Sequence, residues 1–233
     1  MVEVLTIVAL LTPVIQVVLM GVIGYPLATR RPDGMARFRR SGFTWWLATL
    51  AIVALLAAVS LDEVPWTSLA GHDTTALRWV VAVAIGFGLL VAIETAYEAA
   101  TRHATGKGIS GERERYESAL PSWAGSRRAE TGVLSVVAAL EEFLYRGVAL
   151  AGLIGWADLS KPLAAGIVSV AFGAAHWYYG PRQMWLKAVD GGVLCFVAFT
   201  AGWPAAAAAH VLMNVALVLL SRRARSGVQG AVS

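Results

Sequence analysis

The chain has 233 residues, of which 58% are hydrophobic and only 15% are charged. A typical soluble domain is about 45–50% apolar and about 25% charged, so this composition argues against a water-soluble enzyme and equally against a disordered chain. The single cysteine, Cys195, excludes an intrachain disulfide framework. The formal net charge of +4 comes from basic residues in loops between apolar runs, which indicates membrane topology rather than nucleic-acid binding.

Apolar runs predict an all-α fold, a polytopic transmembrane helical bundle with about seven membrane-spanning helices. Roughly 20 apolar residues are needed to cross a bilayer core. In chain order the runs are Val4–Leu27, Phe43–Leu61, Ala76–Ala99, Thr131–Leu153, Pro162–Gly180, Leu186–Gly202 and Pro204–Leu220. The first run lacks the basic start and the cleavage site of a signal peptide, so we interpret it as a mature helix. We expect residues 1–233 to form a single integral-membrane domain.

The distribution of lysine and arginine predicts the orientation of this bundle. Basic residues gather in the loops after the first, third and fifth runs and in the C-terminal tail, and we assign Arg182 and Lys187 to the loop after the fifth run. The positive-inside rule places these parts in the cytoplasm, which gives an outside N-terminus, a cytoplasmic C-terminus and a cytoplasmic polar loop at residues 101–130. The composition is rich in Ala, Val and Arg, as is typical of bacterial proteins, so we expect a bacterial plasma membrane.

Ionisable side chains within membrane helices are costly and are usually functional. Polar groups lie at a similar level of three predicted helices, on the cytoplasmic half: Glu141, Glu142 and Arg146 in the fourth run, His176 in the fifth, and His210 and Asn214 in the seventh. This clustering predicts one site rather than a pathway through the bundle.

Helical spacing assigns these groups to faces. Glu142 and Arg146 are four residues apart with the acid first, which is the favourable order for an ion pair. Glu141 is rotated about 100° from Glu142 on a helix, so one carboxylate can be neutralised while the other faces a cavity. A carboxylate without a cation in a low-dielectric site suits a general base. His210 and Asn214 share one face and can together supply hydrogen-bond donors to an oxyanion.

Three motifs in this region carry a resemblance to a known family. The segments EEFLYR, FGAAH and HVLMN match EExxxR, FxxxH and HxxxN, in that order and on separate predicted helices. The chain thereby resembles the CPBP family, which comprises CAAX prenyl-protein endoproteases and bacteriocin-processing or self-immunity (Abi) proteins. The resemblance implies a helical intramembrane catalytic core, here residues 131–221, that hydrolyses a peptide bond near the membrane surface.

The resemblance also implies a role for each motif residue. Glu141 matches the general base of the family, and His176 matches the residue that helps to hold and activate the water. His210 and Asn214 match the pair that stabilises the oxyanion.

Metal dependence in this family is disputed, and the sequence bears on both mechanisms. A catalytic zinc site needs about three protein ligands, which His176, His210 and Glu141 could supply. However, the sequence has no HExxH helix, and neither histidine has a nearby acid in sequence to orient it. We therefore expect a metal-free mechanism without a cofactor, and zinc is the alternative.

Structural explanations exist for the same residues. The resemblance gives Glu142 and Arg146 a supporting role, but such a pair could also do no more than lock helices together. His176 could be an interfacial histidine, and His210 with Asn214 could hydrogen-bond neighbouring helices. Because all three motifs are complete and occur in order, we favour the functional interpretation.

Other acidic residues are open to both interpretations. Glu94 and Glu98 in the third run, and Asp190 in the sixth, could approach the site or serve the fold. We favour a structural role for them, with Asp190 capping its helix or pairing with Lys187.

The sequence as a whole predicts an intramembrane endopeptidase acting on a membrane-associated protein or peptide substrate. The alternative is a non-enzymatic immunity or scaffold protein of the same fold. A transporter is a more distant alternative, because the polar residues form one compact set. The expected partners are the substrate and the lipid bilayer, with no nucleic acid, while the identity of the substrate and the oligomeric state stay open.

Overall fold

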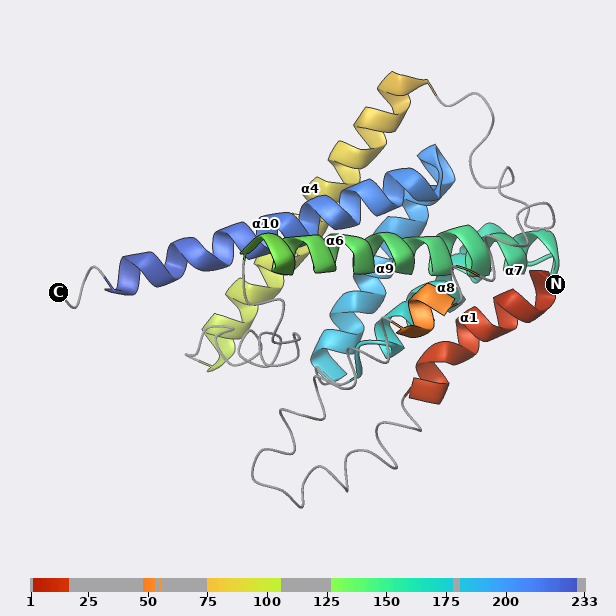
Figure 1. The fold of residues 1–233 in the computed structure, drawn as a ribbon, viewed down its shortest axis with the longest axis horizontal. Coiled ribbons are helices and arrows are strands. Elements are labelled where there is room, and N and C mark those ends of the chain that lie inside the picture. Colours follow the sequence, from red (N-terminus) through yellow and green to blue (C-terminus); the bar gives the residue numbers. More distant parts are fainter. Residues whose placement is uncertain are drawn as a thin grey trace, which may run out of the picture.

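The computed structural model describes residues 2–16, 48–52, 55, 75–105, 127–177 and 181–229. Within these ranges the regular elements are all helical and no strand occurs, which confirms the expected all-α class. In chain order the helices are α1 (Val2–Gln16), α4 (Ala76–Thr105), α6 (Arg127–Glu142), η4 (Phe143–Leu150), α7 (Ala151–Gly155), α8 (Lys161–Ala174), α9 (Pro181–Ala201) and α10 (Trp203–Gln229) (Figure 1).

The helices α6, η4 and α7 follow one another without a break over residues 127–155. The eight residues of η4 are π-helical, and the residues that flank it, Glu142 and Ala151, keep α-helical dihedral angles. π-helical turns are rare overall, but those that occur are often at functional sites. The extra residue per turn changes the direction of the side chains that follow. The EExxxR motif spans this junction, with its two glutamates closing α6 and Arg146 inside η4.

Packing brings the motif-bearing helices around one core. The helix α8 packs on α9, and α10 packs on α6, α4 and α9; Figure 1 shows α10 and α6 running alongside each other. Buried side chains from all of these elements form a single apolar cluster, which includes Leu90, Tyr145, Phe172, Leu194 and Met213. The motifs therefore converge on the interior of the bundle.

The connection from α9 to α10 is one residue long. Gly202 is the only residue between Ala201 and Trp203, and its φ of 87° lies in the region that favours glycine. Pro204 follows within the first turn of α10, where its missing N–H costs nothing. This one-residue turn agrees with the one-residue gap between the predicted runs Leu186–Gly202 and Pro204–Leu220.

The seven-span prediction is not confirmed. Among the described residues, two helices are long and apolar enough to cross a bilayer, Ala76–Thr101 and Pro181–Ala201. The run predicted at Pro162–Gly180 is a helix only from Lys161 to Ala174, about 21 Å at 1.5 Å per residue, which is shorter than the bilayer core of about 30 Å. The apolar part of α10, Trp203–Leu219, is likewise short.

Several sequence predictions lie wholly or partly outside the described residues. The structure covers the first run only as far as Gln16 and covers residues 48–52 and 55 of the second. The predicted loop at 101–130 is helical at both ends, where α4 extends to Thr105 and α6 begins at Arg127, and residues 106–126 are not described. Arg182 and Lys187, which we assigned to a loop, lie instead within α9, because that helix begins at Pro181.

Candidate active site

A fully buried ion pair forms where α6 passes into η4. Arg146 Nη1 donates to Glu142 Oε1 at 3.0 Å, and both side chains are 0% exposed. The guanidinium also lies over the ring of Phe172, 4.6 Å from the ring centre, and Nη2 donates to the backbone carbonyl of Gly191 at 2.9 Å. The ion pair predicted from the i,i+4 spacing is therefore confirmed, and Phe172 and Gly191 also contact its guanidinium.

His210 reaches the same carboxylate from α10. Its Nδ1 lies 2.9 Å from Glu142 Oε1, 68 residues away in sequence. An ionised carboxylate only accepts hydrogen bonds, so Nδ1 is the donor, and a neutral His210 ring carries its lone pair on Nε2. A carboxylate behind an imidazole fixes its orientation and tautomer. Helical spacing gave no signal for this contact, because no acid lies near His210 in the sequence and the partner comes from another helix.

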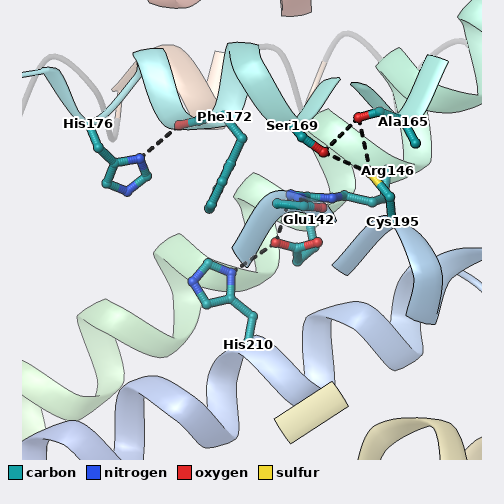
Figure 2. Close-up of polar contacts among 9 residues, drawn as sticks. Glu142, Arg146, Ala165, Ser169, Phe172, His176, Cys195 and His210 are labelled. Carbon is teal, nitrogen blue, oxygen red and sulfur yellow. Dashed lines mark hydrogen bonds and ion pairs between the residues drawn. The ribbon is translucent and has the colours of Figure 1, made fainter. Parts of the chain in front are cut away.

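His176 lies in the turn that follows α8. Its Nδ1 donates to the carbonyl oxygen of Phe172 at 2.8 Å, which fixes this ring in the same way as the ring of His210. The Phe172 ring contacts both imidazoles, with ring centres 4.9 Å from His176 and 5.8 Å from His210. Figure 2 shows the Phe172 ring extending from α8 toward His210, with His176 to one side. The second and third motifs therefore meet around one aromatic ring.

Asn214 lies on the α6–α10 contact, and Glu141 is buried near the end of α6. Asn214 Nδ2 donates to the backbone carbonyl of Leu134 at 3.3 Å, one turn along α10 from His210. Glu141 is 4% exposed and is the neighbour of Glu142 in the chain. Glu142 Oε2 is buried and accepts no hydrogen bond from the described residues. The structure thus joins α6 and α10 by two polar contacts, one through each residue of the HxxxN motif.

A metal ion requires a tighter set of donors than the described residues provide. No group of three or more His, Cys, Asp or Glu side chains in these residues is arranged to hold one ion. A catalytic zinc site takes about three protein ligands, and His176, His210 and Glu141 do not form such a group in this arrangement.

A second charged cluster joins α4 to α9. The ammonium of Lys187 binds the carboxylate of Glu94, and it binds Asp190 Oδ2 at 2.9 Å. All three side chains are largely buried, with 20%, 14% and 5% exposed for Lys187, Glu94 and Asp190. The expected pairing of Asp190 with Lys187 is confirmed, while the contact with Glu94 was not expected, because Lys187 was assigned to a loop.

Comparison with protein families agrees with this geometry. Residues 131–216 match the family model described as type II CAAX prenyl endopeptidase, Rce1-like. This part of the chain is similar to that family. The match confirms the resemblance to the CPBP family, and it contains all three motifs. The Rce1-like family is a family of membrane-embedded proteases. Comparison with curated proteins and with solved structures gives no significant match.

Proposed function

We propose that the protein is an intramembrane endopeptidase that hydrolyses a peptide bond in a membrane-associated protein or peptide. The observation that carries this proposal is the hydrogen bond between Glu142 and His210, within the residues that match the Rce1-like family. It joins the first and third motifs in one buried polar network, and Phe172 of the second motif packs on both Arg146 and His210. Buried polar networks are costly when they are not satisfied, and ionisable groups within membrane helices usually have a function.

In the proposed reaction, Glu141 acts as the general base. Its carboxylate accepts a proton from a water molecule, whose oxygen then bonds to the carbonyl carbon of the substrate. His176 accepts the second hydrogen bond of that water through Nε2, since its Nδ1 donates to the Phe172 carbonyl. When the tetrahedral intermediate collapses, the C–N bond breaks and Glu141 returns the proton to the leaving nitrogen.

His210 and Asn214 stabilise the oxyanion in this proposal. While Nδ1 of His210 donates to Glu142, donation from Nε2 to the oxyanion requires a proton on both ring nitrogens. Asn214 has two N–H groups; one donates to Leu134, and the other is assigned to the oxyanion. Arg146 then holds Glu142 in place through their ion pair, which is the supporting role of this pair.

The cellular location is part of the same proposal. We place the protein in a bacterial plasma membrane as a multi-pass protein, with its N-terminus outside and its C-terminus in the cytoplasm. The one-sided distribution of lysine and arginine supports this orientation, and the two membrane-capable helices α4 and α9 support the membrane location.

The decisive experiment identifies the cleaved bonds. Protein N-termini are compared between membranes of cells that express the wild type and membranes of cells that express Glu141→Gln. Peptides spanning each candidate bond are then incubated with the purified protein in lipid nanodiscs. Glu98→Gln serves as a matched control, because it makes the same change on α4, a helix that carries none of the three motifs. Termini that depend on Glu141 and are reproduced by the purified protein support the proposal, whereas their absence favours the immunity or scaffold alternative.

A further inference from the structure

The helix α9 carries none of the three motifs, but it contacts the buried ion pair directly. The backbone carbonyl of Gly191 accepts a hydrogen bond from Arg146 Nη2 at 2.9 Å. The two terminal nitrogens of Arg146 therefore have different partners: Nη2 binds α9, and Nη1 binds Glu142. A hydrogen bond to a charged donor is stronger than an average one, so this contact fixes the plane of the guanidinium.

Gly191 also lacks a side chain at the point where the guanidinium and α8 approach α9. A Cβ at this position would lie 3.3 Å from Arg146 Nη2, 3.0 Å from Ser169 Cα and 3.3 Å from Ser169 Cβ. These separations are tighter than ordinary van der Waals contacts, and one neighbour is backbone that cannot turn aside. The next residue differs, because a Cβ on Gly192 would meet only Ser169 Oγ, at 3.9 Å.

We infer that Gly191 is a positioning residue that sets the location of the His210 imidazole through Arg146 and Glu142. The inference rests on the proposed function, in which His210 acts on the substrate. Gly191 itself touches no reacting atom. Three consecutive contacts carry the effect: Gly191 O to Arg146 Nη2 at 2.9 Å, Arg146 Nη1 to Glu142 Oε1 at 3.0 Å, and Glu142 Oε1 to His210 Nδ1 at 2.9 Å.

The second and third contacts share one oxygen atom. Arg146 and His210 both donate to Glu142 Oε1. A methyl group at residue 191 would displace the guanidinium of Arg146, and the carboxylate of Glu142 would then either move with it or lose its hydrogen bond. In both cases the group that orients His210 changes position. Positioning errors of about 1 Å in a catalytic group can cost about a hundredfold in rate. Crowding at Gly191 therefore acts on the site through the ion pair.

The test compares the histidine side chains of four proteins in lipid nanodiscs. The chain has four histidines, so selective isotope labelling gives a spectrum in which each ring nitrogen is assigned from single His→Gln variants. The variants are Gly191→Ala, Gly192→Ala as the uncrowded neighbour, and Gly152→Ala as a packing control. A Cβ on Gly152 crowds only Thr6 among its nearest atoms. We expect Gly191→Ala to move both ring nitrogen resonances of His210 and to leave those of His103, which is exposed on α4.

The controls decide between positioning and general loosening. His210 resonances that stay in place in Gly191→Ala, or that move equally in Gly152→Ala, overturn the inference. This readout needs no substrate, so an absence of peptidase activity in the wild type counts against the proposed function and leaves the positioning to be judged from the spectra.

Kinetics on a peptide that the wild type cleaves add a second readout. We expect Gly191→Ala to lower kcat by about tenfold to a hundredfold with KM unchanged, and Gly192→Ala to keep both values. In an Arg146→Lys background, which removes the Nη2 donor, Gly191→Ala should add no further loss. If the loss of kcat in the double variant equals the product of the two single losses, Gly191 acts by separating α8 from α9. That result would overturn the inference that Gly191 acts through Arg146.

Discussion

Glu142 and His210 are hydrogen-bonded through Oε1 and Nδ1 at 2.9 Å, although 68 residues separate them in the chain. The same oxygen atom accepts the hydrogen bond from Arg146. One carboxylate therefore neutralises a buried cation and orients an imidazole at once. The loss of Glu142 should therefore affect stability, whereas Glu141 is the proposed base, and the two glutamates lead to different expectations.

The first prediction contrasts Glu141→Gln with Glu142→Gln. Glu141→Gln removes the proposed proton acceptor at almost no change in shape, so turnover should be abolished while the unfolding temperature stays close to that of the wild type. Glu142→Gln leaves Arg146 buried without its counter-charge, which should lower the free energy of unfolding by about 3–5 kcal/mol. Thermal unfolding in nanodiscs and peptide cleavage measure the two effects. A stable, inactive Glu142→Gln alongside an active Glu141→Gln would show that the roles are reversed.

The second prediction concerns the cluster that joins α4 to α9. Lys187→Met leaves Glu94 and Asp190 without their shared cation, and Asp190 Oδ1 already accepts no hydrogen bond from the described residues. Stability should fall by up to about 3 kcal/mol, and Glu94→Gln in the same chain should recover part of the loss. Lys161→Met is the control, since that lysine is exposed and its ammonium lies 5.7 Å from the centre of the Phe199 ring. Equal losses for both lysine variants would argue against the cluster.

Local spacing predicted the contacts that lie within one helix. Glu142 with Arg146, and Asp190 with Lys187, are neighbours because helix geometry alone brings residues three or four positions apart together. The contact of Glu142 with His210 depends on how α10 packs against α6, and no periodicity in either segment encodes that. The motifs therefore contain residues that the fold brings together, but helical spacing assigned Glu142 only one of its two partners.

Hydropathy also has physical limits in this chain. The run Pro162–Gly180 was read as one helix because its aromatic residues count as apolar, but α8 ends at Ala174 and His176 lies in the turn beyond it. Lys187 was assigned to a loop because of its charge, whereas two carboxylates offset that charge within α9. The π-helical geometry of Phe143–Leu150 had no signal at all, since its apolar pattern suits either kind of helix.

The third prediction tests the orientation, which depends on residues outside the described ranges. Reporter fusions after Arg40, Arg115 and Arg225 should report the cytoplasm, and a fusion after Asp73 should report the outside, because the basic residues lie on one side of the proposed spans. An outside signal at Arg115 would contradict both the orientation and the number of spans on which it is based.

The fourth prediction concerns the oxyanion. Asn214→Ala removes both N–H groups of the side chain, so kcat should fall by about 10²–10³ with little change in KM. Asn214→Asp keeps the shape but supplies no donor when it is ionised, and it should lose a similar factor. A purely structural role through Leu134 predicts instead a lower unfolding temperature, with normal kcat for the fraction that remains folded.

The last prediction concerns metal dependence. The described residues hold no group of three metal-binding side chains, and Asn214 is an amide, which is a poor zinc ligand and a good hydrogen-bond donor. Purified protein should therefore keep its peptidase activity after exhaustive chelation, and elemental analysis should find no stoichiometric metal. Loss of activity on chelation with recovery on adding zinc would overturn the metal-free mechanism. His176 and His210 would then be reassigned as ligands through Nε2, each already oriented through Nδ1 by an acceptor behind it.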